Sequence, residues 1–260
     1  MFLISEQSKN KCKEDLKSYG FGVLRNAISL DFLKKLENEV LNFSWGNIGK
    51  AEINVIETNQ KCVLSSSHNL VNNLETFRDL YNSKIIKSLY LELIGNYPNT
   101  QNKINSSYFF KSKQSKEIKI HQDNAYFNLF DGIDCLTFYI PIHFQSKSNG
   151  TIFYYSGSHL LEDLDHVPEG NLGASMCLTK NRSLKEFDIK YLDLQPGDIV
   201  IHNAWVVHGT LANPNNVLCE AFNFTFFGET NKINEIKYNQ YKSKLKKFLS
   251  EKATINKKNQ

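Results

Sequence analysis

The feature that most constrains this chain is a series of short strand-like segments after about residue 105. Six segments rich in aromatic and β-branched residues follow one another, with no helical pattern between them. Turn signals such as Asp131-Gly132, Asn149-Gly150 and Pro196-Gly197 separate them. The segments are residues 107–111, 118–121, 135–142, 150–155, 199–202 and 221–227. Consecutive short strands without intervening helices predict an antiparallel barrel or jelly roll.

Helical patterns occupy the remainder of the chain. Ser29 precedes an amphipathic stretch over residues 30–43, and a second stretch over residues 70–93 ends at Gly95. A third helical stretch is expected over residues 233–252. With no internal repeat and no linker, we expect one domain over residues 1–260, mainly β with flanking α-helices.

Composition excludes several classes of protein. Hydrophobic residues make up 41% and charged residues 22% of 260, which are globular values and not those of a disordered chain. No apolar run approaches 18 residues, and the first seven residues lack the apolar stretch of a signal peptide. The five cysteines are spread widely without a CxxC pair, so a disulfide framework or a cysteine zinc site is not expected. These features predict a cytoplasmic protein.

The positive charge of the chain is concentrated at its C-terminal end. Residues 231–260 contain nine lysines and two glutamates and carry +7, whereas the whole chain carries +4. We therefore expect a basic C-terminal helix over 231–260 with lysines in solvent, an apolar stripe packed on the body, and a frayed end at 257–260. The stripe consists of Ile236, Leu245, Phe248 and Leu249. No nucleic-acid-binding motif accompanies the charge, so nucleic acid is not an expected partner.

Three residues have the chemistry of a non-haem iron site. His121 and Asp123 end one predicted strand, and residues two apart on a strand point to the same face. A second histidine must come from elsewhere, and His208 follows the Pro196-Gly-Asp198 turn and the strand after it. Two histidines and one carboxylate form the facial triad that binds Fe(II) and leaves coordination positions open.

These segments give the chain a resemblance to a known family. Tyr19-Gly-Phe-Gly-Val-Leu-Arg25, His121-Gln-Asp-Asn124, the segment Asn149–His159, Pro196-Gly-Asp198 and His208 occur in the order and spacing typical of that family. The chain therefore resembles the phytanoyl-CoA dioxygenase (PhyH) family of Fe(II)/2-oxoglutarate-dependent oxygenases, over most of its length.

The resemblance implies both a fold and a reaction. The fold is a double-stranded β-helix, a cupin-like jelly roll with helices packed outside it. His121, Asp123 and His208 would hold the iron and carry catalysis, with Fe(II), 2-oxoglutarate and O2 as cofactor and cosubstrates. The expected reaction is hydroxylation of a small-molecule substrate, because related halogenases lack the carboxylate that Asp123 supplies.

The chain departs from the family at the cosubstrate site. The family usually has an arginine about eleven residues after the distal histidine, and this position falls at or near Cys219. Lys119, two residues before His121, is our first candidate for a replacement cation. The resemblance also gives Tyr139 and Thr210 a role in binding the cosubstrate. Lys111 and Lys113 lie on or near the preceding strand.

Other residues near the metal motifs could line a substrate pocket or belong to the core. They are Asn124, Tyr126, Phe127 and Trp205. Two alternative functions remain open at this level. One is an iron oxygenase of the same fold that does not use 2-oxoglutarate, and the other is a catalytically degenerate jelly-roll protein.

Overall fold

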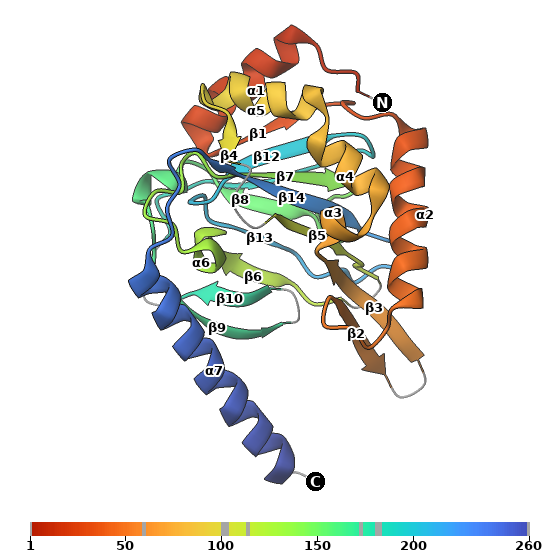
Figure 1. The fold of residues 1–260 in the computed structure, drawn as a ribbon, viewed down its shortest axis with the longest axis vertical. Coiled ribbons are helices and arrows are strands. Elements are labelled where there is room, and N and C mark those ends of the chain that lie inside the picture. The colour runs from red at the N-terminus through yellow and green to blue at the C-terminus, as the bar shows by residue number, and fades with distance from the viewer. Residues whose placement is uncertain are drawn as a thin grey trace.

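The computed structural model describes residues 2–58, 61–99, 104–112, 115–171, 174–179 and 184–258. Its centre is a jelly roll of two antiparallel sheets (Figure 1). The larger sheet has the strand order β1-β12-β7-β14-β5-β3-β2, with β4 paired to β14, and the smaller has the order β11-β8-β13-β6. The strands of the larger sheet are β1 (Phe21–Leu24), β2 (Ile53–Thr58), β3 (Lys61–His68), β4 (Pro98–Asn99), β5 (Asn105–Phe109), β7 (Leu136–Pro141), β12 (Ile199–Asn203) and β14 (Ala221–Gly228).

The smaller sheet and a separate hairpin complete the β structure. The smaller sheet consists of β6 (Ile118–His121), β8 (Ile152–Tyr155), β11 (Ile189–Tyr191) and β13 (His208–Thr210), and the hairpin of β9 (His166–Asn171) and β10 (Ala174–Leu178). The helices are α1 (Glu6–Tyr19), α2 (Leu30–Gly46), α3 (Leu70–Asn73), α4 (Glu75–Asn82), α5 (Lys84–Ile94), α6 (Asn124–Phe127) and α7 (Glu235–Lys258). The six predicted strands correspond to β5, β6, β7, β8, β12 and β14.

Alternation along β14 separates the core from the interior of the barrel. Phe222, Phe224 and Phe226 are buried in the main hydrophobic cluster with apolar residues of the helices. Phe77 of α4 packs edge-on against Phe222 at 4.4 Å between ring centroids. The intervening residue Asn223 lines the cavity between the sheets. Helices α2 to α5 therefore cover the outer face of the larger sheet and leave its inner face for the site.

The predicted helix over residues 70–93 is three helices in the structure. The chain is extended at Leu74 and again at Ser83, which separates α3, α4 and α5. Ser83 begins α5 as its N-cap, because its Oγ accepts a hydrogen bond from the Ile86 amide at 3.2 Å. Gly95 ends α5 in the left-handed conformation, as the sequence predicts.

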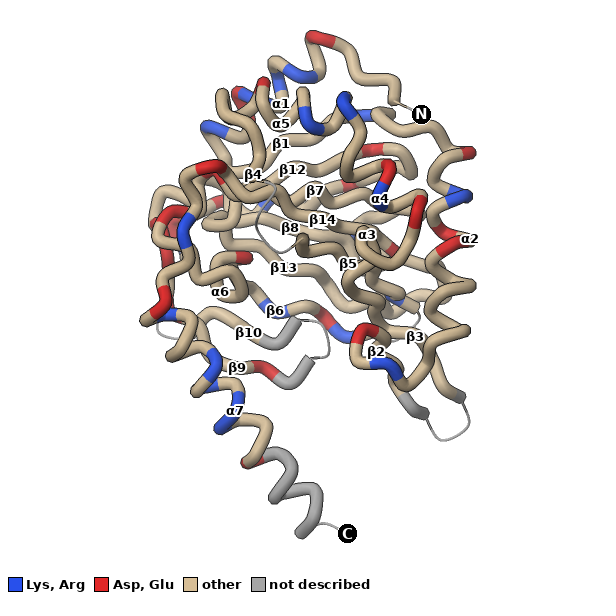
Figure 2. The backbone as a smooth tube through the Cα atoms, viewed as in Figure 1, with Lys and Arg blue, Asp and Glu red and all other residues tan. Residues whose placement is uncertain are grey.

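The C-terminal helix forms, but its predicted packing is wrong for half of the stripe, because Leu245 and Phe248 are half-buried whereas Ile236 and Leu249 are exposed. Ile236 is 73% exposed and Leu249 is 56% exposed, because α7 extends away from the body of the molecule (Figure 1). Near its start α7 packs against β9 and α6, and Lys237 pairs with Asp163. Figure 2 shows the basic residues spaced along α7, whereas β7, β12, β13 and β14 carry no charged residue. The helix runs to Lys258, and residues 259–260 of the expected frayed end lie outside the described residues.

No helix in the part of the chain that the structure describes is long and apolar enough to cross a membrane.

Candidate functional site

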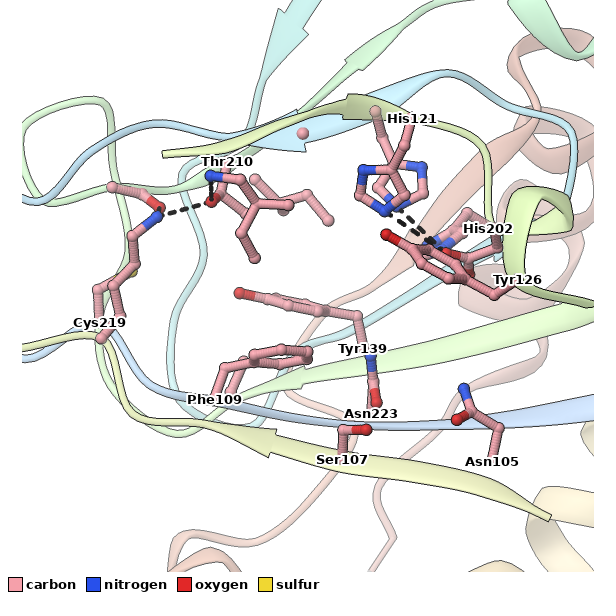
Figure 3. Close-up of a pocket in the computed structure, with 18 of the residues that line it drawn as sticks. Asn105, Ser107, Phe109, His121, Tyr126, Tyr139, His202, Thr210, Cys219 and Asn223 are labelled. Carbon is pink, nitrogen blue, oxygen red and sulfur yellow. Dashed lines mark hydrogen bonds and ion pairs between the residues drawn. The ribbon is translucent and has the colours of Figure 1, made fainter. Parts of the chain in front are cut away.

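A cavity of about 1020 Å³, counting its open mouth, lies between the two sheets (Figure 3). The smaller sheet contributes His121 and His208 to its lining, and β5, β7 and β14 of the larger sheet form the opposite wall. Its polar lining residues include His68, Asn105, Ser107, Lys111, His121, Asp123, Tyr139, His202, His208, Thr210 and Asn223.

The structure brings His121, Asp123 and His208 together at one end of this cavity. His121 is the last residue of β6 and lies opposite His208, the first residue of β13. Asp123 precedes α6. Its Oδ1 lies 3.8 Å from His121 Nε2 and 3.6 Å from His208 Nε2. All three side chains offer one ligand atom to a common point, within 4.8 Å of one another.

Backbone contacts fix which nitrogen of each histidine faces that point. His121 Nδ1 donates to the carbonyl of Lys119 at 2.8 Å, and His208 Nδ1 donates to the carbonyl of Val206 at 3.0 Å. Each Nε2 therefore keeps its lone pair. Burial lowers the pKa of His121, and it lowers the pKa of His208 well below the usual range of histidine. Both rings are therefore neutral near pH 7.

Two donors hold the carboxylate of Asp123 in place. His202 Nε2 donates to Asp123 Oδ2 at 3.2 Å, and the Thr137 hydroxyl donates to the same oxygen at 2.7 Å. Tyr154 in turn donates to His202 Nδ1 at 2.9 Å, which fixes the protonated nitrogen of His202 on the Asp123 side. Burial disfavours the charged carboxylate, but the His202 hydrogen bond and the electrostatic attraction of the three surrounding histidines together hold the pKa of Asp123 below its usual range. Oδ1 is left for a ligand.

A chain of hydrogen bonds connects this carboxylate to the opposite wall. Asn105 Nδ2 donates to Thr225 Oγ1 at 3.3 Å, and Thr225 lies 3.0 Å from Thr137 Oγ1. Because Thr137 donates its one proton to Asp123, Thr225 must be the donor to Thr137. The direction of every bond in the chain is thus determined, and Asp123 is oriented by residues of β5, β14 and β7.

The donor set fits a divalent iron ion. Two neutral imidazoles with free Nε2 lone pairs and one ionised carboxylate oxygen converge from one side, and the cavity lies on the other. This arrangement matches the facial triad expected from the sequence.

Comparison with known families places this geometry in context. Residues 16–217 match the phytanoyl-CoA dioxygenase (PhyH) family. The chain belongs to this family of Fe(II)/2-oxoglutarate-dependent oxygenases. The match extends from the end of α1 to the segment before β14 and includes all three residues of the triad.

Solved structures show the same fold at low sequence identity. The epimerase SnoN, solved with Fe3+, alpha ketoglutarate and nogalamycin RO, is 16% identical with a TM-score of 0.67, over 88% of this chain and 87% of SnoN. EvdO2 from Micromonospora carbonacea var. aurantiaca, complexed with 2-oxoglutarate, is 14% identical with a TM-score of 0.68, over 90% and 95%. EctD from S. alaskensis, with 2-oxoglutarate and 5-hydroxyectoine, is 15% identical with a TM-score of 0.68, over 89% of this chain and 78% of EctD. No curated protein sequence gives a significant match.

The usual arginine position of the phytanoyl-CoA dioxygenase family falls at or near Cys219, and a buried lysine lies beside this residue. Lys111 Nζ donates to Thr210 Oγ1 at 2.6 Å, to the Gly150 carbonyl at 3.3 Å and to the Leu211 carbonyl. Lys111 is 8% exposed. Burial lowers its pKa to about 8, so the ammonium still predominates at pH 7. The end of the cavity opposite the triad therefore contains a cation.

Lys119, the first candidate from the sequence, lies outside the cavity. Its side chain is 47% exposed and pairs with Glu169 at 3.4 Å. The reason is a β-bulge: His208 pairs with His121 and Thr210 pairs with Ile118, so two steps on β13 oppose three on β6. The extra residue breaks the alternation, and Ile118 lines the cavity in place of Lys119. Lys113 lies outside the described residues.

The other expected residues divide into two groups. Tyr139, Thr210, Tyr126 and Phe127 line the cavity, and the Tyr139 hydroxyl donates to Gln145 Oε1 at 2.9 Å.

Asn124 and Trp205 do not line this cavity. Asn124 holds the turn after α6: its Oδ1 accepts from the Leu129 amide at 2.8 Å and its Nδ2 donates to Asp163 at 2.8 Å. Trp205 packs beside Gly132. Sequence reasoning did not identify Thr137 or Asn223, since neither follows a recognisable pattern.

Proposed function

We propose that this protein is an Fe(II)/2-oxoglutarate-dependent oxygenase that hydroxylates a small molecule. The observation that supports this most strongly is the convergence of His121, Asp123 and His208, with every other polar atom of these side chains already hydrogen-bonded or pointing away. Such outer partners are typical of side chains that ligate a metal, because they fix the tautomer and the orientation of each ligand.

Each residue of the triad has a stated task in this proposal. His121 and His208 would bind Fe(II) through Nε2, and Asp123 would bind through Oδ1. When bound together, Fe(II) and 2-oxoglutarate supply the activation of O2 that oxidises an unactivated C–H bond. The protein residues hold the metal on one wall, exclude bulk water by burial and position the two organic molecules.

Lys111 and Thr210 would bind the distal carboxylate of 2-oxoglutarate. Lys111 supplies the positive charge that the family usually takes from arginine. Thr210 Oγ1 accepts from Lys111 and from the Ile118 amide at 3.1 Å, so its own proton is available for a carboxylate. Tyr139 lies on the facing wall and packs alongside this end of the cavity (Figure 3).

Hydroxylation is favoured over halogenation by the retained carboxylate. Asp123 would occupy the coordination position that a halide needs. The structural relatives include an epimerase and a carbocyclase, SnoN and SnoK, so the same fold supports other oxidations.

The proposal is tested by incubating the protein with Fe(II), 2-oxoglutarate and O2 and measuring succinate. Succinate formation above a metal-free control is the expected result. Iron-dependent O2 consumption without succinate would support an iron oxygenase that does not use 2-oxoglutarate, an alternative that Cys219 at the arginine position favours. Absence of iron binding would support a degenerate jelly-roll protein.

A further inference from the structure

A row of neutral polar side chains crosses the wall of the cavity that faces the triad. His68 pairs with Ser107, Ser107 pairs with Asn223, and Asn223 pairs with Tyr139, on the adjacent strands β3, β5, β14 and β7. All four side chains line the cavity. Adjacent strands are about 4.8 Å apart, so the row presents polar groups at that interval across the sheet.

The hydrogen bonds behind the row leave Ser107 ready to donate. His68 Nε2 lies 3.1 Å from Asn54 Nδ2 and 3.0 Å from Ser66 Oγ. The Asn54 amide nitrogen can only donate, so Nε2 accepts, Ser66 can donate to it as well, and His68 carries its proton on Nδ1. Nδ1 lies 2.8 Å from Ser107 Oγ and donates to it. Burial lowers the pKa of His68, which keeps the ring neutral. The Ser107 hydroxyl proton is then free to bond a molecule in the cavity.

Asn223 is the second unsatisfied group of the row. Its Oδ1 is buried and has no hydrogen-bond partner among the described residues. Leaving a buried carbonyl oxygen unpaired costs stability, and such groups are retained where a ligand satisfies them. Rotation of the amide about its last torsion presents either the oxygen or the nitrogen to the cavity. Ser107 and Asn223 therefore offer a donor and an acceptor side by side.

The charges of the cavity lie away from this row. Apart from the histidines, Lys111 and Asp123 are the ionisable acidic and basic side chains among the described lining residues. The proposed function assigns Asp123 to the metal and Lys111 to the cosubstrate. A fatty acyl chain on this wall would leave Ser107 and Asn223 without partners. An amino acid would bring a carboxylate and an ammonium group that the row cannot neutralise.

An aromatic face completes the surface. Phe109 follows Ser107 by two residues on β5 and lines the same cavity, and Tyr126 lines it beside the triad (Figure 3). Phe127 is also among the lining residues. Hydroxyl-bearing rings combine polar edges with apolar C–H faces, and this wall combines hydrogen-bonding groups with aromatic faces.

We propose that Ser107 and Asn223 of this row bind the substrate, and that the substrate is a neutral molecule with neighbouring hydroxyl groups, of the polyol or glycoside class. This inference rests on the proposed oxygenase function, because it treats the triad and Lys111 as occupied by metal and cosubstrate.

The test uses calorimetry on the anaerobic protein loaded with Fe(II) and 2-oxoglutarate. The probes are a panel of neutral methyl glycosides and cyclitols, palmitoyl-CoA, and L-proline as a zwitterion. We expect binding by members of the neutral panel only. Tighter binding of palmitoyl-CoA or L-proline, or no binding by any neutral probe, would overturn the proposal.

Variants separate a binding role from a structural one. Asn223→Leu and Ser107→Ala should each weaken binding of the best neutral probe at least about tenfold. Ser106→Ala is the matched control, because Ser106 Oγ accepts from the Val71 amide on the other face of β5. It should leave probe affinity unchanged.

Two further readouts keep this test independent of the proposed function. Asn223→Leu should raise the melting temperature of the ligand-free protein, because it removes an unpaired buried oxygen; a lower melting temperature with unchanged probe affinity would make Asn223 structural and contradict the inference. The spectrum of Fe(II) with 2-oxoglutarate should be the same in all variants. If the wild-type protein showed no charge-transfer band with Fe(II) and 2-oxoglutarate, that result would instead count against the oxygenase function.

Discussion

Lys111 Nζ lies 2.6 Å from Thr210 Oγ1, and the pair forms the end of the cavity opposite the triad. Thr210 is two residues after His208 on the same short strand. A single strand thus contributes to both ends of the site. This relationship gives the chain a cation where its sequence lacks the arginine of its family.

Lys111→Met should weaken binding of 2-oxoglutarate by about 10- to 100-fold, since it removes the positive charge at this end of the cavity and the ammonium that holds Thr210 Oγ1, and an interaction with a charged group is worth about 1.5–3 kcal/mol. The binding constant is measured anaerobically with Fe(II) present. Lys119→Met is the control and should leave it unchanged, because Lys119 is half-exposed and pairs with Glu169. Equal effects of the two substitutions would contradict the assignment of Lys111.

Affinity for 2-oxoglutarate should fall as the pH rises above about 8. Burial lowers the pKa of Lys111 to about 8, so the charged form is present below this pH and is lost above it. Measuring the dissociation constant between pH 6.5 and 9.5 tests this. The decline should be absent in Lys111→Met, and a decline of the same size in that variant would assign it to another group.

Thr137→Val should weaken Fe(II) binding by about tenfold or more, because it removes a donor that orients Asp123. Valine has nearly the same volume, so the core should keep its packing. Thr151→Val provides a comparison, since Thr151 Oγ1 donates to the Leu192 carbonyl elsewhere in the barrel. Metal affinity that drops equally in both variants would indicate a general loss of stability.

Deleting residues 252–260 should leave succinate formation unchanged. The helix α7 extends away from the cavity, and its contacts with the body lie near its start (Figure 1). The rate is compared with that of the full chain at equal protein concentration. A loss of turnover in a protein with an unchanged melting temperature would show that the end of α7 acts on the site.

The parts of the fold that repeat a local pattern could be predicted from the sequence. The alternation in the segment around Phe222, Phe224 and Phe226 predicts β14, and the spacing of His121 and Asp123 predicts a common face. Family resemblance then connects these elements into a jelly roll.

The errors arise where local rules meet tertiary structure. The face of Lys119 depends on a β-bulge, and a bulge needs the partner strand to be known. The stripe of α7 satisfies helical periodicity, but only Leu245 and Phe248 are half-buried, whereas Ile236 and Leu249 face solvent, because periodicity alone does not say which side of a helix meets the body. Asp123 is held by Thr137 and His202, which come from strands far apart in sequence. The position of His202 in the strand before His208 fits a core residue or a partner of a metal ligand, but no pattern in the sequence identifies Thr137.

The most direct test of the central claim is an anaerobic titration of Fe(II), with and without 2-oxoglutarate, in the wild type and in Asp123→Ala. We predict about one Fe(II) per wild-type chain, a metal-to-ligand charge-transfer band that appears when 2-oxoglutarate is added, and Fe(II) affinity at least about tenfold weaker in the variant. A wild-type protein that shows no such band, or an Asp123→Ala protein that binds Fe(II) and 2-oxoglutarate as the wild type does, would contradict the account.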